Sequence, residues 1–178
     1  FEVPVWELLA GNCRDKIRLH LMQGGGTPET MHESARNAVE EGFTALKFDP
    51  IVGDYYDMGQ ARIIQSAVDL VAAARAGGGP DLDLIVEVHR KLTPLVAIDL
   101  AEALKPFHLY FLEDPIQIDS ITAQAEIARK IAVPLGNGER FNTIWEFREL
   151  LEQGGPQYVR PDVALAGGLT HCKKIAAI

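Results

Sequence analysis

The chain has 178 residues, of which 47% are hydrophobic and 24% charged, so it can bury a core as one domain or most of one. Its formal net charge of −8 argues against nucleic acid and against an anionic membrane surface as partners, because both require a basic patch. A small anionic substrate would therefore need a local cation. No apolar run approaches the roughly 18 to 20 residues of a membrane span, and the first residues lack the layout of a signal peptide, so we expect a cytoplasmic protein.

The ends of the chain and its cysteines add two expectations. The chain begins without Met and stops at KKIAAI inside a helical pattern, so we expect a portion of a longer protein. Cys13 and Cys172 lie far apart, with neither metal-ligand nor redox spacing, and are interpreted as ordinary thiols of a reducing compartment.

A strand, a helix and a second strand are predicted at the start of the chain. The strands are IRLHLM from Ile17 and TALKFD from Thr44, two short runs rich in β-branched and aromatic residues. The segment TPETMHESARNAVEEG lies between them. Thr27 is its predicted N-cap, Pro28 its first helical residue and Gly42 its terminator, which together predict a helix.

The same alternation continues to the end of the chain. Further strands are predicted for LIVEVH from Leu84, LYFLED from Leu109, PLGNGE from Pro134 and YVRPDVAL from Tyr158. PLGNGE is the least strand-like of them, because it is rich in glycine. Further helices are predicted at about residues 59–76, 94–104, 119–130, 143–153 and from 168 onward, with a turn at residues 77–80.

Six βα units are therefore predicted, and the closed form of such an array is the eight-stranded barrel of about 250 residues. We predict an α/β fold in which residues 1–178 form part of a (β/α) TIM-type barrel, with the last two units absent. A doubly wound open sheet is the alternative. The glycines at 24–26 do not match G-x-G-x-x-G, and the sequence contains no P-loop motif, which disfavours that alternative.

Three carboxylates close three successive predicted strands. Glu87, Glu113 and Glu139 follow one another at intervals of 26 residues, as equivalent positions in neighbouring βα units would. In parallel α/β folds these strand ends carry the chemistry. Three carboxylates at one barrel mouth would repel one another and lose hydration unless a cation compensates them. The spacing of all three therefore predicts a Mg²⁺ site, although any one of these glutamates taken alone is better interpreted as a solvated or ion-paired strand end.

Four segments of the chain resemble the motifs of a known family. The segments VEVH, FLEDP and GNGERF, followed by RPDVALAGGLTH, resemble the mandelate racemase and muconate lactonizing branch of the enolase superfamily across most of the chain. The resemblance implies an enolase-like C-terminal barrel domain, with an N-terminal capping domain that we expect outside residues 1–178. It also implies that Glu87, Glu113 and Glu139 hold Mg²⁺, and that a metal-bound substrate carboxylate stabilises the ene-diolate formed on loss of the α-proton.

Two departures from the family pattern refine the expected chemistry. The first ligand in the family is usually Asp, and Glu87 adds a methylene group that the site must accommodate. The racemases end the second strand with Lys-x-Lys, whereas this chain has Lys47-Phe48-Asp49 and so lacks the second lysine that would act as base. This difference disfavours a lysine-based racemase or cycloisomerase.

Further site residues are inferred from their positions. His89 lies two residues beyond Glu87, on the same side of the strand, and resembles the histidine of galactonate and mannonate dehydratases that helps the hydroxyl leave. Asp162 matches the family's strand-six aspartate, which orients a histidine base on strand seven; a turn residue is the alternative. Lys47 is predicted to face the substrate carboxylate, with a strand-end ion pair as the alternative.

Weaker candidates for substrate or lid contacts are Arg140, Tyr55 and Tyr56, and His20 is a candidate for the barrel mouth. The resemblance as a whole implies a magnesium-dependent carbon–oxygen hydro-lyase. Its reaction would be dehydration of an acid sugar of the galactonate, mannonate or gluconate type to a 2-keto-3-deoxy acid, and the protein would commonly be a homo-oligomer. A racemase or epimerase of the same superfamily and a noncatalytic acid-sugar-binding barrel are the alternatives.

Overall fold

Six parallel strands lie side by side in chain order in the computed structural model, which describes residues 1–9 and 11–178. They are β1 (Leu21–Met22), β2 (Ala45–Phe48), β3 (Asp83–Glu87), β4 (Phe111–Glu113), β5 (Leu135–Asn137) and β6 (Tyr158–Val159). All six predicted strands are confirmed, including the glycine-rich fifth, and each is shorter than its sequence run. The last run shortens most, from eight residues to two, and the first shortens from six to two, because β6 and β1 are the two edge strands of this sheet.

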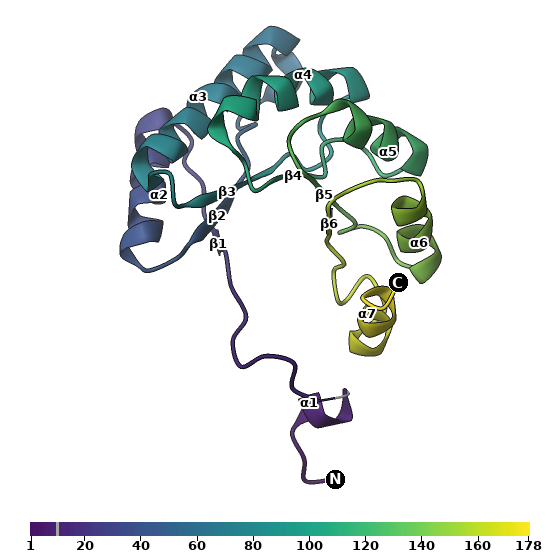
Figure 1. The fold of residues 1–178 in the computed structure, drawn as a ribbon. Coiled ribbons are helices and arrows are strands. Elements are labelled where there is room, and N and C mark those ends of the chain that lie inside the picture. Colours follow the sequence, from purple (N-terminus) through teal and green to yellow (C-terminus); the bar gives the residue numbers. More distant parts are fainter. Residues whose placement is uncertain (10) are drawn as a thin grey trace.

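Helices follow the strands as predicted. They are α2 (Pro28–Glu40), α3 (Gln60–Gly78), α4 (Pro94–Leu104), α5 (Ile121–Lys130), α6 (Ile144–Glu152) and α7 (Leu169–Ile175), with 3₁₀ turns η1 (Tyr55–Asp57) and η2 (Lys105–Phe107) and a short α1 (Val5–Leu8) near the start. Figure 1 shows α2 to α6 arranged along the outer side of a curved sheet, while the segment before β1 extends away from it. Helices on one side of a parallel sheet in chain order form an incomplete (β/α) barrel and not a doubly wound sheet.

The helix boundaries follow from local sequence. The Thr27 hydroxyl accepts the N–H of Thr30 in a capping box, Pro28 begins α2, and Gly42 ends it with a φ of +87°. The turn predicted at residues 77–80 is partly wrong, because α3 continues through Gly78. A Cβ at Gly77 would lie 2.1 Å from a backbone oxygen of α2, so glycine permits this close packing of α2 and α3.

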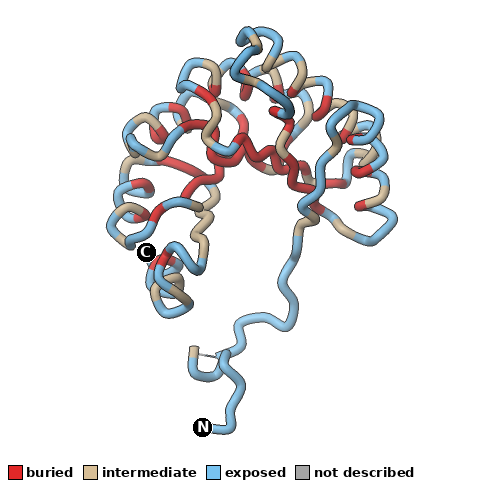
Figure 2. The backbone as a smooth tube through the Cα atoms, turned by 180° about the vertical axis from the view of Figure 1, so that it is seen from behind, coloured by how far each residue is buried: buried red, intermediate tan, exposed pale blue. Residues whose placement is uncertain are grey.

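The two faces of the sheet differ in chemistry. One face packs against the helices and forms the main hydrophobic core, to which the strands contribute Leu46, Phe48, Leu84, Val86, Leu112 and Leu135. Figure 2 shows the buried residues concentrated on the strands and on the helix surfaces that face them. The alternate strand residues, among them Lys47, Glu87 and Glu113, project to the opposite, concave face. In the described part of the chain, no helix is long and apolar enough to span a membrane.

Candidate active site

The centre of the site is a lysine between two glutamates. Lys47 Nζ, from β2, lies 2.8 Å from Glu87 Oε2 at the end of β3 and 2.8 Å from Glu113 Oε1 at the end of β4. The register pairs Glu87 directly with Glu113, which brings their side chains to the same level of the concave face. All three side chains are buried. The strand-end ion pair that was the alternative for Lys47 is therefore present, and its predicted place facing the substrate carboxylate stays a prediction.

Burial of two carboxylates around one ammonium group perturbs both acids. Burial, together with the charge of Glu87, raises the pKa of Glu113 to about 7. Burial also disfavours the charged form of Glu87, but its hydrogen bonds to Lys47 and Glu113 prevail and lower its pKa. Arg160 Nε lies 3.3 Å from Glu113 Oε1, so both nearby cations contact the same oxygen. Glu113 Oε2 is buried with no hydrogen-bond partner among the described residues.

Glu139, the third predicted ligand, has a different partner. Arg90 Nη1 lies 2.9 Å from Glu139 Oε2 and 3.0 Å from Asp114 Oδ2. Within residues 1–9 and 11–178, no three His, Cys, Asp or Glu side chains converge closely enough to hold one metal ion. The structure thus brings Glu87 and Glu113 together and turns Glu139 toward Arg90.

The residues nevertheless suit a hard divalent cation. The donor set consists of carboxylates from the ends of three consecutive strands, which is the ligand chemistry that Mg²⁺ prefers. Among the described residues, no donor reaches Glu113 Oε2, and Glu113 and Glu139 line the same pocket of about 380 Å³. Metal binding at these residues would exchange the contacts of Glu87 with Lys47 and of Glu139 with Arg90 for contacts with the ion. The assignment of the three glutamates as ligands stays a prediction.

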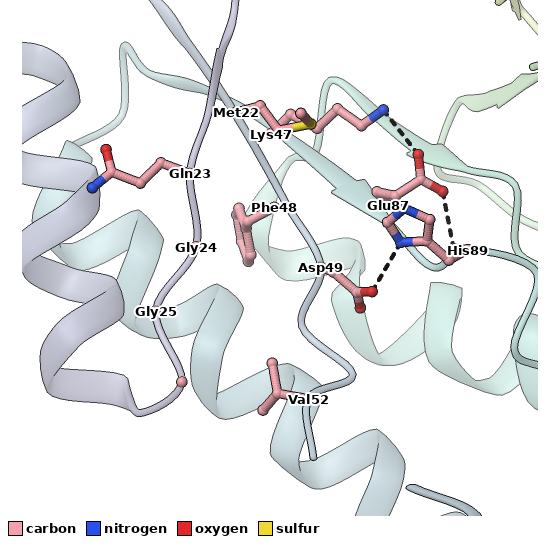
Figure 3. Close-up of a pocket in the computed structure, with 11 residues that line it drawn as sticks. Met22, Gln23, Gly24, Gly25, Lys47, Phe48, Asp49, Val52, Glu87 and His89 are labelled. Carbon is pink, nitrogen blue, oxygen red and sulfur yellow. Dashed lines mark hydrogen bonds and ion pairs between the residues drawn. The ribbon is translucent and has the colours of Figure 1, made fainter. Parts of the chain in front are cut away.

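A second pocket of about 380 Å³ adjoins the first, and Lys47 lines both. Figure 3 shows this pocket, with Glu87 and His89 on one wall and residues 22–25 on the other. The His89 backbone N–H donates to Glu87 Oε1 at 2.9 Å, and its ring Nδ1 lies 2.9 Å from Asp49 Oδ2. The structure therefore places His89, Lys47 and Glu87 on the lining of one pocket, and their roles stay predictions.

Asp162 lines the first pocket and also performs the turn role that was its alternative. Its Oδ1 accepts the N–H of Leu165 at 2.8 Å, and its carbonyl accepts the N–H of Ala166. This turn follows β6 directly. Its proposed part in orienting a strand-seven histidine stays a prediction.

Four weaker candidates lie outside both pockets. Arg140 is exposed, and Tyr55 stacks on Tyr56 with ring centroids 4.2 Å apart. These positions do not test the assignment of Arg140, Tyr55 and Tyr56 as substrate or lid contacts. His20 lines a separate pocket with Ala45 and Tyr110, near the amino ends of β2 and β4, so its expected place at the mouth is wrong. Burial, with the nearby charge of Arg160, lowers the pKa of His20.

Three residues at the site were not singled out for these roles. Arg160 contacts Glu113, Asp49 contacts His89, and Arg90 contacts Glu139. Strand alternation could have placed the first two on the concave face, since Arg160 lies two residues after Tyr158, and Asp49 two after Lys47, but it could not have paired them with Glu113 and His89. Strand alternation could not have placed Arg90, because this residue lies beyond the end of β3. Its φ of +63° turns the chain there, so the alternation of faces no longer applies.

Comparisons with known proteins agree with this architecture. The family model described as enolase C-terminal domain-like matches residues 30–178. D-galactonate dehydratases of Klebsiella pneumoniae and Variovorax paradoxus are 32% and 31% identical to the chain over 98% and 99% of its length, and 46% of each of theirs. The chain thus spans about half the length of the curated relatives that it matches.

Solved structures of related proteins match the chain over nearly its whole length. A member of the enolase superfamily from Salmonella Typhimurium superposes with a TM-score of 0.91 at 30% identity, covering 98% of this chain and 50% of that one. A mandelate racemase/muconate lactonizing enzyme-like protein from Rubrobacter xylanophilus does so with a TM-score of 0.88 at 32% identity, with the same coverage. From the match to the family model over most of its length, the chain belongs to the enolase C-terminal domain-like family.

Proposed function

We propose that the protein is a magnesium-dependent acid-sugar dehydratase that converts a sugar acid into a 2-keto-3-deoxy acid. The observation that carries this proposal is His89, whose ring lines a pocket beside Glu87 and Lys47. The two relatives named D-galactonate dehydratase support the same reaction class. Galactonate, mannonate and gluconate all suit a pocket whose lining includes one lysine and several polar groups.

The proposed metal ligands are Glu87, Glu113 and Glu139. Bound there, Mg²⁺ would stabilise the negative charge that develops on the substrate carboxylate when the α-proton leaves. Lys47 lines both pockets, so its ammonium group can face that carboxylate from the β2 side. The base that removes the α-proton is proposed to be a histidine outside this chain, with Asp162 as its orienting partner.

His89 is proposed to protonate the leaving hydroxyl. As the C3–O bond breaks, the proton on Nε2 passes to the departing oxygen and releases water. The electron pair of the former α C–H bond becomes the new C2–C3 double bond. The enol product then takes up a proton at C3 and loses the proton of its C2 hydroxyl, which gives the keto acid. Histidine suits this step because the ordinary pKa of an imidazole lies close to neutral pH, so the ring can both hold and release a proton.

The test is an acid-sugar screen of the full-length protein with keto-acid formation as readout. We expect turnover that EDTA abolishes and Mg²⁺ restores. Deuterium exchange at the substrate α-carbon is measured in the same samples. No keto acid from any sugar acid, in protein shown to be folded, would contradict the dehydratase proposal.

The alternatives give different results in that screen. A racemase or epimerase would exchange the α-proton and invert the centre without forming keto acid, whereas a noncatalytic binder would do neither. The second-strand position that is lysine in the racemases is here Asp49, whose carboxylate is engaged by His89 and Lys91. This contact favours the dehydratase over a lysine-based racemase.

A further inference from the structure

The carboxylate of Asp49 is held at both oxygens. Oδ1 accepts the backbone N–H of Ile51 at 2.9 Å, and Oδ2 faces both Lys91 Nζ and the Nδ1 of His89. Lys91 also donates to the Ile51 carbonyl at 2.7 Å, so the lysine is anchored at a second point. The Asp49 side chain is thus fixed independently of the histidine.

The histidine is likewise fixed from its own side. His89 and Arg90 adopt left-handed φ values of +53° and +63°, which are costly for residues with a Cβ. Two hydrogen bonds hold this turn: the His89 N–H donates to Glu87 Oε1, and the Arg90 N–H donates to the Asp114 carbonyl at 2.7 Å. The turn directs the His89 ring toward Asp49, as Figure 3 shows.

Exposure distinguishes the two partners. The His89 side chain is 48% exposed and borders the pocket, whereas that of Asp49 is 24% exposed. Among the described residues, only Nδ1 of the ring has a hydrogen-bond partner, so Nε2 is the nitrogen left for a ligand. A carboxylate on one imidazole nitrogen fixes which nitrogen carries the proton in the neutral ring and how the ring is turned.

We propose that Asp49 is a positioning residue for His89: its carboxylate holds the Nδ1–H, so that Nε2 is the nitrogen presented to the substrate. The catalytic meaning of this contact rests on the proposed function, but the contact itself can be tested without it. After Nε2 has given its proton to the leaving hydroxyl, the ring is left as the Nδ1–H tautomer, which is the form that Asp49 accepts from. Lys91 contributes by holding the carboxylate in place.

The sharpest variant is Asp49→Ser in the full-length protein. A serine hydroxyl can still accept the Ile51 N–H and so keep the turn, but it is too short to reach His89. We expect the ¹⁵N spectrum of neutral His89 to change from the Nδ1–H tautomer in the wild type to a mixture or to the Nε2–H tautomer. Asp57→Asn, a change of an exposed carboxylate on the same loop, is the control and should leave the spectrum unchanged.

Kinetics provide the second readout. With a sugar acid found active in the screen, Asp49→Ser should lower kcat for keto-acid formation by about 10- to 100-fold, with little change in KM and with α-proton exchange retained. If Asp49 acts through His89 alone, adding Asp49→Ser to His89→Asn should cause no further loss, because the two effects are not additive.

An unchanged tautomer in Asp49→Ser would overturn the proposal, as would a full additional loss in the double variant. Should Asp49→Ser not fold, Asp49→Asn replaces it. With its carbonyl oxygen kept at the Ile51 N–H, its NH₂ group donates to the ring and requires the Nε2–H tautomer; retention of Nδ1–H there would again contradict the proposal. Failure of the dehydratase proposal is separate, because it would appear as no keto acid from any sugar acid in the folded wild-type protein, whatever the tautomer.

Discussion

Leu112 and Glu113 are neighbours on β4, yet they belong to opposite faces of the sheet. Leu112 is fully buried in the hydrophobic core against the helices, whereas Glu113 is buried on the concave face between Lys47 and Arg160. The first position contributes to folding through removal of apolar surface from water. The second opposes folding whenever its carboxylate is charged, since burial raises its pKa. Adjacent residues of equal burial therefore act in opposite directions on stability.

The same division runs along the neighbouring strands. On β2 and β3, the helix-facing positions are apolar, while Lys47 and Glu87 face the site. Stability is thus concentrated on one face and chemistry on the other, so variants of the two faces should separate the two properties.

The largest effect is expected from Glu113→Gln. Loss of a charged ligand should reduce turnover to background and greatly weaken Mn²⁺ binding measured by calorimetry, while the metal-free protein should be no less stable to urea at pH 8. Glu126→Gln, an exposed change on α5, is the control. Metal binding at wild-type affinity in Glu113→Gln would remove this residue from the ligand set.

His89→Asn should lower keto-acid formation by about 10²- to 10⁴-fold, the usual cost of losing a general acid. Deuterium exchange at the substrate α-carbon should persist, and metal affinity should change little, because His89 is not a proposed ligand. The exposed His32→Asn on α2 serves as control. Loss of exchange together with elimination would instead identify His89 as the base.

Leu112→Ala should show the reverse pattern from Glu113→Gln. Removal of a fully buried leucine side chain should cost about 2 to 5 kcal/mol in the free energy of unfolding, measured with urea. Keto-acid formation at a permissive temperature should stay close to that of the wild type. Leu112→Met, which preserves the side-chain volume, should cost less than about 1.5 kcal/mol. Equal losses in both variants would show that core packing at β4 does not set stability.

The smallest expected effect is a pH dependence of the metal-free protein. The folded-state pKa of Glu113, about 7, is above its ordinary value of 4.5, so the folded state binds more protons than the unfolded state between these values. Stability in EDTA should therefore decrease as pH rises from about 4.5 to about 7, and Glu113→Gln should remove that contribution. An identical pH slope in the variant would mean that another group causes it.

Much of the fold could be predicted from the sequence because its signals are local. Alternating apolar runs and helical segments predicted all six strands, and Thr27 with Pro28 predicted the start of α2 correctly. The 26-residue spacing brought Glu87 and Glu113 to neighbouring strand ends, where the register pairs them. Backbone regularity alone is sufficient for this part of the site.

Only the tertiary structure decided which charged side chains pair with one another. Lys47 and Glu113 are 66 residues apart in sequence, and His89 and Asp49 are 40 apart, so no local pattern could pair them. The orientation of Glu139 toward Arg90 likewise depends on the left-handed turn after β3, a conformation that the residues His89 and Arg90 do not favour by themselves. Side-chain partners at the mouth are chosen by the curvature of the sheet and the shape of its loops, because buried charges contact whichever opposite charge the folded backbone brings within reach.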